Sequence, residues 1–394
     1  MSKVFGYKMR CILYVALCML CATPLHGMVH AKTNAADYEW AVVGAGPAGI
    51  VVIGLLMDLG IDPQTIAWVD PEFSVGRLSA YNNVPANSTV KSFVDFLQAC
   101  KTFSSCKLSL DKIYSYGLDK EPPLGELVVP LQEITQYLQS QVIPVRSYLK
   151  ALNFSDDIWH VAVECRSFSA QRVVLATGSH PRSLNYACGN EIPLDIALDK
   201  KQLAQYVEPS DAIAVVGSAH SAVLTMKFLS ELPVARIINF YNRPIYYVEH
   251  TSSGVLHPEG GLKGTAAEWA KNVLEKNPPA NLLRLLNTEA LRAAWLPICN
   301  KIVYAAGFER NDLPPINESC NPVTYDNHTG VIAPHLFGIG IAFPEVTVDP
   351  AGNSEHRVGL NSFMAYAQRI TPEWLHKDLY RFRSFEKLFM IEML

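Results

Sequence analysis

Three glycines near the start of the chain have the spacing of a phosphate-binding turn. Gly44, Gly46 and Gly49 form the pattern G-x-G-x-x-G between a short apolar run and an apolar stretch that continues to Leu59. The first glycine allows a tight bend, the second lets a pyrophosphate approach the backbone, and the third lets helix and strand pack closely. This pattern predicts a dinucleotide site. We assign cofactor contacts to the whole turn: Gly44, Ala45, Gly46, Pro47, Ala48 and Gly49.

An acidic residue follows at the distance that such a site requires. Asp70 comes directly after the apolar run at 66–69 and lies 21 positions beyond Gly49. A carboxylate at that point accepts hydrogen bonds from a ribose diol. Pro71 and Arg77, in the loop after Asp70, are assigned to the same site. The alternative, an ordinary glycine-rich turn, is disfavoured because strand, glycines, helix, strand and acid occur in order.

A degenerate copy of this pattern begins at Asp211. An apolar run at 212–216 precedes a turn in which alanines replace the second and third glycines, and Arg243 follows the next apolar run. An arginine there suits the 2′-phosphate of NADP, whereas Ala219 narrows the room for a pyrophosphate. A plain strand-to-helix turn and a solvated Arg243 stay open as alternatives. The nucleotide contacts assigned here are Gly217, Ser218, Ala219, His220, Ser221 and Arg243.

Two more apolar runs end in glycine turns. The first ends in Ala176, Thr177 and Gly178 after a stretch of alternating residues typical of strands. The second contains Gly338 and Gly340 in the last third of the chain. All five residues are assigned to cofactor binding.

Composition excludes several other classes. The chain has 394 residues, of which 49% are hydrophobic and 18% charged, and a net charge of −4, so nucleic acid is not an expected partner. No spacing of His, Asp or Glu indicates a metal. Ser179 and Ser221 lack the G-x-S-x-G of a hydrolase nucleophile. The six cysteines beyond residue 31 contain no C-x-x-C, which argues against a flavin disulfide reductase.

The first thirty-one residues have the order of a secretory signal. Basic residues precede an apolar run at 11–20, and small residues follow near Ala31. The run is short for a membrane span, so we expect a cleaved signal peptide over 1–31 and a secreted or periplasmic protein without stable membrane insertion. A retained anchor is the alternative.

The elements that must position these residues indicate an α/β fold in which one nucleotide domain is inserted into another. The expected parts are a first domain over residues 38–205, an inserted domain over 211–300, and the closing part of the first domain over 301–394.

These motifs resemble those of two-dinucleotide-domain flavoproteins, and among them the flavin-containing and N-hydroxylating monooxygenases, from about Tyr38 to about Ile370. GAGPAG with Asp70 resembles their FAD site, and GSAHSA their NADP turn. LATGSHPR at 175–182 is similar to the segment that links the two domains, and VYAAGFER at 303–310 to a later ATGY-type segment. The resemblance implies FAD and NADPH, with a Rossmann-like FAD domain and a smaller, nested NADP-binding domain.

One local match implies a catalytic residue. Tyr81, Asn87-Ser88 and Lys91 resemble a Tyr…Asn-Ser…Lys segment of flavin-containing monooxygenases, in which the asparagine lies beside the flavin and the nicotinamide. The implied role of Asn87 is hydrogen bonding near the reactive flavin. Asn87-Ser88-Thr89 is also a glycosylation sequon, and a glycan requires a surface loop. Asn87 cannot serve both purposes.

The resemblance implies an NADPH-dependent monooxygenase that oxidises a soft nucleophile, nitrogen or sulfur, of a small-molecule substrate. The cofactor carries the redox chemistry in such enzymes, so few catalytic side chains are expected. An NAD(P)H oxidase or dehydrogenase without hydroxylation is one alternative. A binding protein that keeps the fold without catalysis is another. The sequence does not indicate an oligomeric state.

Overall fold

The computed structural model describes residues 36–318 and 323–376. The signal expected over 1–31 lies outside these ranges, as does the end of the part expected over 301–394. Among the helices of the described ranges, none is long and apolar enough to cross a membrane.

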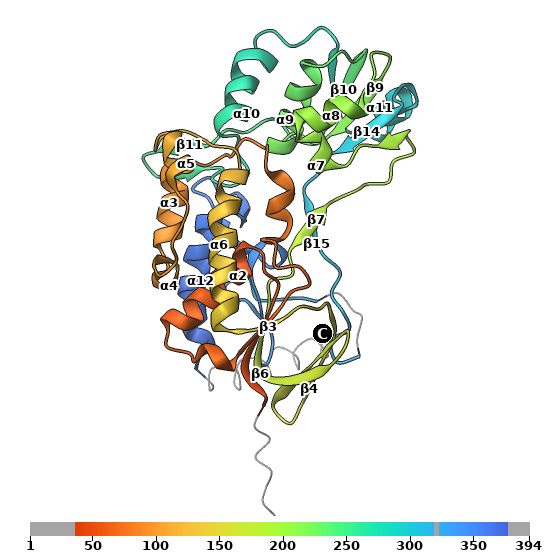
Figure 1. The fold of residues 1–394 in the computed structure, drawn as a ribbon. Helices are drawn as coiled ribbons and strands as arrows, with labels where there is room; N and C mark the ends of the chain where they lie inside the picture. The colour runs from red at the N-terminus through yellow and green to blue at the C-terminus, as the bar shows by residue number, and fades with distance from the viewer. Residues whose placement is uncertain (1–35, 319–322, 377–394) are drawn as a thin grey trace, which may run out of the picture. The chain divides into compact units, whose positions relative to one another are not determined.

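The larger sheet contains β1 (Tyr38–Val43), the strand expected before the first glycine turn (Figure 1). It pairs in parallel with β2 (Ile66–Val69) on one side and β6 (Ser167–Leu175) on the other. β3 (Ile143–Val145) continues the sheet beyond β2, and β17 (Leu336–Gly338) continues it beyond β6, both in parallel. This parallel arrangement, with helices beside it, confirms the α/β, Rossmann-like prediction.

Helices cover one face of this sheet. α2 (Pro47–Asp58) starts immediately after the glycine turn, with Pro47 at its first position, where the missing N–H costs nothing. Nine of its twelve residues are buried, because the helix is apolar on nearly every side. α6 (Gly125–Gln141) and α12 (Leu360–Trp374) pack against it, and Figure 1 shows all three on the same side of the sheet.

A two-stranded meander extends the sheet beside β6. β4 (Leu149–Ser155) and β5 (Ile158–Val163) form a hairpin, and β5 pairs antiparallel with β6. Asp156 and Asp157 form its turn with φ of 52° and 59°, the left-handed backbone of a two-residue hairpin loop. Trp159 of β5 is fully buried in the cluster on this side of the sheet.

A second parallel sheet carries the degenerate turn, and α9 (His220–Ser230) packs against it. Its strands, in spatial order, are β13 (Leu282–Leu286), β10 (Arg236–Tyr241), β9 (Ala212–Val216), β14 (Lys301–Tyr304) and β8 (Asn190–Glu191).

This sheet takes in more of the chain than the range 211–300. β14 pairs with β9, and β8 pairs with β14, so residues on both sides of that range belong to the second sheet. The ammonium of Lys301 adds a bond to the Asp211 carboxylate, 2.6 Å away. The boundary drawn between 300 and 301 therefore cuts through this sheet. The sequence of the apolar run at 302–305 could not show which strand it would pair with.

Three small antiparallel pairs connect or flank the sheets. They are β7 (Ser179–Pro181) with β15 (Phe308–Arg310), β11 (Glu249–Thr251) with β12 (Gly254–Leu256), and β18 (Glu345–Val348) with β19 (Ser354–Arg357). The first pair lies where the chain runs between the two sheets.

The remaining elements are short. One of them, α10 (Gly264–Trp269), is followed by one π-helical turn, η3 (Ala270–Leu274). The others are η1 (Pro63–Thr65), η2 (Gly76–Tyr81), α3 (Val90–Gln98), α4 (Lys101–Ser104), α5 (Asp111–Ser115), α7 (Leu194–Ala197), α8 (Lys200–Tyr206), α11 (Glu289–Trp295), η4 (Leu296–Ile298), η5 (Gly340–Ala342) and β16 (Val331–Ala333).

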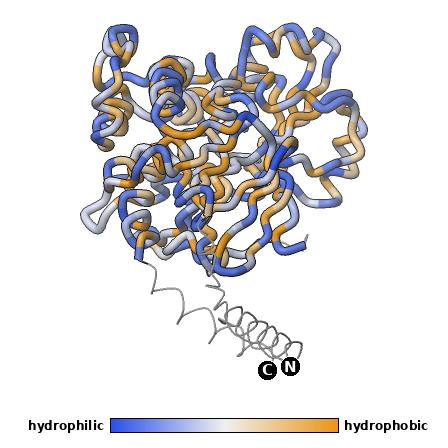
Figure 2. Tube along the Cα trace, turned by 60° about the horizontal axis from the view of Figure 1, so that its bottom comes forward, coloured by the Kyte–Doolittle hydropathy of each residue, from blue (hydrophilic) through white to orange (hydrophobic). Residues whose placement is uncertain are grey.

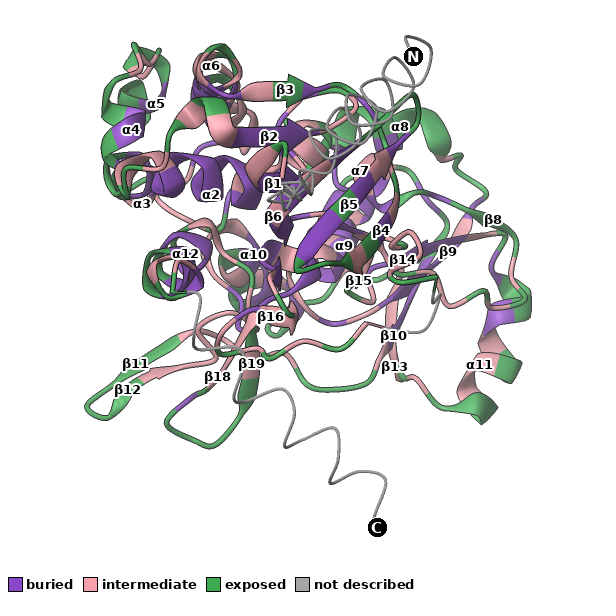
Figure 3. Ribbon diagram, turned by 90° about the horizontal axis from the view of Figure 1, so that it is seen from below, coloured by how far each residue is buried: buried purple, intermediate pink, exposed green. Residues whose placement is uncertain are grey.

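Burial follows hydropathy along these elements. In Figure 2 the hydrophobic stretches follow the interior strands and helices, while hydrophilic stretches follow the peripheral loops. Figure 3 shows β1, β2 and α2 buried, whereas the β11–β12 hairpin and much of α11 are exposed. The elements around the first glycine turn thus belong to the best-packed part of the structure.

Candidate dinucleotide-binding sites

The three glycines of the first turn meet different surroundings. Gly44 has a φ of +107°, and a Cβ there would lie 2.2 Å from the carbonyl oxygen of Ala176. A Cβ on Gly49 would lie 2.0 Å from the oxygen of Gly44. A Cβ on Gly46 would meet nothing within 4 Å. Packing therefore requires the outer two glycines, while the middle one borders open space at the start of α2.

The Asp70 carboxylate supports this turn. Its Oδ2 accepts a hydrogen bond from the Ala45 N–H at 2.7 Å. Its Oδ1 accepts from the N–H groups of Glu72 and Phe73, at 2.9 and 2.7 Å. A carboxylate offers about four acceptor positions, so roughly one is left for a ligand. The ribose contact stays a prediction, and the structure adds a bracing role that the sequence did not reveal.

The loop after Asp70 returns to the middle glycine. A Cβ on Gly76 would lie 3.1 Å from the Cα of Gly46, so these two backbones nearly touch. Arg77, the next residue, is exposed, and Pro71 is half-buried. Sequence analysis assigned Arg77 but missed Gly76. Gly76 could have been found from the sequence, because it directly precedes Arg77 and is the one glycine in the loop that follows Asp70.

The segment at 176–178 lies directly against the first turn. The Ala176 N–H donates to Val43 at 2.8 Å, which continues the β1–β6 pairing into the turn. Thr177 has a buried Oγ1 without a hydrogen-bond partner among the described residues. Asn311, which sequence analysis missed, donates from Nδ2 to the Thr177 carbonyl at 2.8 Å. Buried hydroxyls are normally paired, so the Thr177 hydroxyl fits a site that a ligand completes.

Gly340 reaches the same place from the C-terminal part of the chain. It has a φ of +80°, and a Cβ there would lie 2.6 Å from the Cβ of Ala48 in the first turn of α2. Gly338 is needed for packing as well, because its Cβ would lie 2.4 Å from the Phe343 ring. The structure thus brings Gly340 next to the first turn, while Gly338 serves the strand behind it.

The second turn repeats the bonds of the first. Gly217 has a φ of +134°, and its Cβ would lie 2.2 Å from the carbonyl of Ala305, as Gly44 does with Ala176. Asn239 Nδ2 donates to the Gly217 carbonyl at 2.8 Å, just as Trp68 Nε1 donates to the Gly44 carbonyl at 2.9 Å. Both donors come from the strand that follows the helix. Ser218, Ala219, His220 and Ser221 therefore occupy the positions of Ala45, Gly46, Pro47 and Ala48.

The same equivalence corrects the placement of Arg243. The N–H of Gly44 donates to Val69, and that of Gly217 donates to Phe240, both at 2.8 Å. The residue after each acceptor is Asp70 in the first site and Tyr241 in the second. Arg243 therefore lies two residues beyond the position of the acid, and it is exposed. The sequence alone did not show where β10 ends, so it matched Arg243 to the acid by charge. The contact of Arg243 with a 2′-phosphate stays a prediction.

His220 stays neutral near pH 7. Burial, with a smaller effect of the Lys263 ammonium, lowers the pKa of the His220 imidazole to about 4. His220 is the first residue of α9, where a neutral ring avoids opposing the positive end of the helix dipole. Lys263, another residue that sequence analysis missed, places a cation near this helix end.

Asn87 lies in a different setting. It is exposed, two residues before the Thr89 hydroxyl that caps α3, and its Oδ1 accepts a hydrogen bond from Ser88 at 3.4 Å. The residues described above beside the first turn, such as Ala176, Gly76 and Gly340, do not include Asn87. The catalytic role of Asn87 remains a prediction.

The residues around the first turn fit a dinucleotide. Gly46 borders open space, the N-terminus of α2 has no side-chain cap, and the Thr177 hydroxyl lacks a partner among the described residues. The free N–H groups and the helix dipole favour a pyrophosphate there. FAD held in this way would supply the redox chemistry, and the chain supplies its position.

A cluster of possible metal ligands also lies outside both turns. His257, Asp349 and Glu355 place one ligand atom each within 4.8 Å of one another. Sequence spacing had indicated no metal, and it could not reveal this group because two of its members lie about ninety residues beyond the first.

Known proteins are similar to this chain in sequence. The family described as pyridine nucleotide-disulphide oxidoreductase matches residues 38–277. The monooxygenase AgnR1 of Paecilomyces divaricatus is 30% identical over 393 aligned residues, covering 85% of this chain and 97% of that protein.

Solved structures share the fold. L-lysine 6-monooxygenase from Pseudomonas syringae superposes with a TM-score of 0.58 at 13% identity, covering 87% of this chain and all of that one. A flavin monooxygenase from Stenotrophomonas maltophilia gives 0.56 at 12%, covering 86% and 98%. The bacillithiol disulfide reductase of Staphylococcus aureus gives 0.55 at 10%, covering 87% and 100%. At these identities the likeness shows the fold alone.

The family match and the relative agree with the geometry of the two turns. The five described cysteines beyond residue 36 are all free. The chain therefore belongs to the pyridine nucleotide-disulphide oxidoreductase family and is a FAD-dependent, monooxygenase-like oxidoreductase.

Proposed function

We propose that the chain is an NADPH-dependent monooxygenase that oxidises a nitrogen or sulfur atom of a small molecule. The observation that carries the proposal is the repeated turn, because Gly44 and Gly217 make the same bonds in two separate parallel sheets. Two such turns suit one tightly bound dinucleotide and a second one that binds and dissociates in each catalytic cycle. The monooxygenase relative supports oxygenation rather than another use of the reduced flavin.

The two turns would have different roles in binding the two dinucleotides. The first turn, with Ala176, Thr177 and Gly340 packed around it, would hold FAD rigidly. The second turn has Ala219 where the first has Gly46, so it would hold its pyrophosphate less closely. Weaker binding suits a nucleotide that must leave after each turnover. Arg243 and Lys263 would supply positive charge for its phosphates.

Oxygen transfer requires a site that excludes water and places substrate beside the flavin. Asn87 is the residue proposed to donate hydrogen bonds there, because an amide offers two donors and does not titrate. We further propose a cleaved signal over residues 1–31 and a secreted protein with a small-molecule substrate.

One experiment separates the proposal from its alternatives. The purified protein is reduced anaerobically with NADPH, and its visible spectrum is followed. Oxygen is then admitted with a panel of amines and sulfides. Flavin reduction followed by oxygenated product supports the proposal. Reduction with all the oxygen recovered as hydrogen peroxide identifies an oxidase. A flavin that neither nicotinamide nucleotide reduces identifies a binding protein.

A further inference from the structure

Three side chains form a row that begins at Arg243. The guanidinium carbon of Arg243 lies 5.9 Å from the centre of the Tyr246 ring, which is within the range of a cation–π contact. The Tyr246 ring stacks on the His257 imidazole, with 4.5 Å between centres and 20° between planes. The orientation of Arg243 is therefore tied, through one ring, to that of His257.

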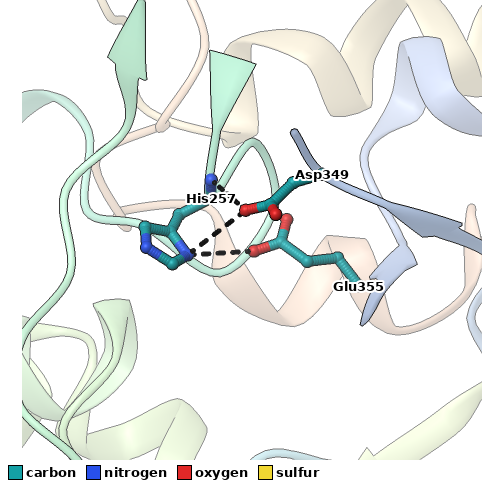
Figure 4. A group of neighbouring side chains, drawn as sticks. All are labelled: His257, Asp349 and Glu355. Atoms are coloured by element: carbon teal, nitrogen blue, oxygen red, sulfur yellow. Dashed lines mark hydrogen bonds and ion pairs between the residues drawn. The ribbon is translucent and has the colours of Figure 1, made fainter. Parts of the chain in front are cut away.

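His257 in turn faces two acids from the β18–β19 hairpin (Figure 4). Its Nδ1 lies 3.8 Å from Asp349 Oδ2 and 3.7 Å from Glu355 Oε1. The exposed fractions of these two acidic side chains are only 0% and 9%. Carboxylates so little exposed need polar groups beside them, and the His257 imidazole is a polar side chain that faces both.

Backbone groups hold both carboxylates in place. Asp349 accepts hydrogen bonds from the backbone N–H groups of Ala351, Asn353 and His257, at 2.9, 2.8 and 3.2 Å. The side-chain amide of Asn353 also donates to Asp349 Oδ2 at 2.9 Å, and this bond is the main reason that the pKa of Asp349 is lowered to about 2. Glu355 uses Oε2 to accept from the Glu259 N–H at 2.8 Å. Its other oxygen, Oε1, is the one near His257.

Glu355 also lies near Arg243. A Cβ built on Gly260 would be 3.1 Å from Glu355 Oε1 and 3.7 Å from Arg243 Nη2. The position of Gly260 thus lies between the Glu355 carboxylate and the Arg243 guanidinium. Without the imidazole, Arg243 would be the cation best placed to move toward Glu355.

The other charges around the cluster have partners of their own. Glu259 accepts a hydrogen bond from Ser362 Oγ at 2.6 Å and lies 4.0 Å from the Arg357 guanidinium. Glu345 pairs with Arg369 at 2.6 Å and with Arg357 at 3.6 Å. His257 and Arg243 are therefore the nitrogen-bearing side chains that Glu355 Oε1 is placed to contact.

We propose that His257 is a positioning residue that keeps Arg243 available to the 2′-phosphate of NADPH, and that it thereby sets the preference over NADH. His257 does so by pairing with Asp349 and Glu355 and by stacking on Tyr246. The inference rests on the proposed use of NADPH and deepens it by naming what determines nucleotide selectivity.

The test variant is His257→Phe in the FAD-loaded full chain. Phenylalanine keeps a ring to stack on Tyr246 but removes the nitrogen that faces the acids. The probes are adenosine 2′,5′-bisphosphate and AMP, which differ by the 2′-phosphate, with binding measured by calorimetry. We expect the preference for the bisphosphate to fall by roughly three- to tenfold while AMP affinity stays unchanged, because a charge-assisted contact accounts for about a tenfold difference or more. The KM for NADPH should rise by the same factor with kcat unchanged.

Three further variants control the result. His356→Phe makes the same change at the exposed neighbour of Glu355 and should alter neither affinity. Adding Glu355→Gln to His257→Phe removes the carboxylate that competes for Arg243, so it should restore at least half of the lost preference. In an Arg243→Ala background His257→Phe should have no additional effect on the ratio, as coupled residues require.

The outcomes separate this inference from the proposed function. If wild type prefers the bisphosphate and His257→Phe keeps that preference, the inference is overturned and NADPH use stands. Equal losses for both probes, with a lower melting temperature, identify a general structural role and also overturn it. If wild type binds both probes equally, Arg243 does not contact the 2′-phosphate, and this inference is overturned as well.

Discussion

At the scale of single residues, the three glycines of the first turn differ in what they contribute. A Cβ on Gly44 or Gly49 would lie only 2.2 or 2.0 Å from a carbonyl oxygen, whereas a Cβ on Gly46 would meet nothing within 4 Å. A substitution at Gly46 should therefore remove the ligand and spare the fold. A substitution at Gly46 therefore tests directly whether FAD binds at this turn.

We expect Gly46→Val to purify folded but colourless, because its side chain fills the space proposed for the pyrophosphate. Its melting temperature should equal that of wild type freed of cofactor. Gly49→Ala should instead fail to fold or melt far lower, since its Cβ would strike the Gly44 carbonyl. Absorbance near 450 nm and thermal melting check both variants. Normal flavin content in Gly46→Val would refute the placement of the cofactor.

Asn87→Asp should uncouple turnover while sparing flavin binding and reduction. The change keeps the side chain's size but replaces two donors with acceptors and adds a negative charge. We expect the ratio of hydrogen peroxide released to NADPH consumed to rise several-fold, measured by a peroxide assay. Asn185→Asp, at another exposed loop asparagine, is the matched control. A glycan found on Asn87 by mass spectrometry would contradict its catalytic role.

His220 gives the protein a stability that depends on pH. Burial lowers the pKa of this group from 6.5 to about 4, so between these values the unfolded chain binds a proton that the folded chain does not. The contribution is present above about pH 6.5 and is lost as the pH falls toward 4. We expect roughly 1–3 kcal/mol to be lost across this window.

Urea unfolding at a series of pH values measures this loss. His220→Gln should show a shallower decline between pH 6.5 and 4 than wild type, and the difference between the two curves isolates His220 from the carboxylates. Superimposable slopes would show that the imidazole is accessible to protons in the folded state.

At the scale of elements, the first site is held together by the close approach of η5 to α2. Gly340 permits it, with a φ of +80° and a Cβ position only 2.6 Å from that of Ala48. Gly340→Ala should therefore destabilise the protein by about 2–4 kcal/mol, through overpacking and a strained backbone. FAD affinity should fall as well, because the helix start shifts.

A second substitution distinguishes the two causes. Ala48→Gly in the Gly340→Ala background removes the methyl group that is struck, so stability should recover to within about 1–2 kcal/mol of wild type, the backbone cost alone. Denaturant melts and flavin titration provide the measurements. No recovery would mean that the backbone conformation, rather than the contact with α2, accounts for the requirement for glycine.

At the scale of the whole molecule, the described part of the chain comprises two parallel sheets that each carry one turn. Such a pair suits hydride transfer from a mobile nucleotide to a fixed flavin. The 30% identity to a monooxygenase extends over 85% of the chain, so the similarity is not confined to one turn.

The N-terminal residues precede this arrangement. We expect the mature protein to begin near Lys32, because basic, apolar and small residues follow one another in the order of a cleaved signal. Edman sequencing or intact-mass analysis of protein from the native host provides the measurement. A soluble cytoplasmic product that retains Met1 would rule out export.

The sequence by itself determined the two turns and the elements around them. β2 lies at 66–69 and β9 at 212–216, as predicted, because short apolar runs bounded by turn residues have few other ways to be buried. The dinucleotide site also followed from local spacing, because phosphate binding depends on consecutive backbone groups.

Only the tertiary structure decided which segments meet. Gly76 and Asn311 were not assigned from the sequence, and Gly340 was assigned without its close approach to Ala48. The equivalence of Asp70 with Tyr241 rather than Arg243 required the pairing of β9 with β10. The cluster of His257 with Asp349 and Glu355 likewise depends on a hairpin folding back from the end of the chain. Contacts of this kind depend on packing and strand order, because residue spacing along the chain fixes only the neighbours within one turn or strand.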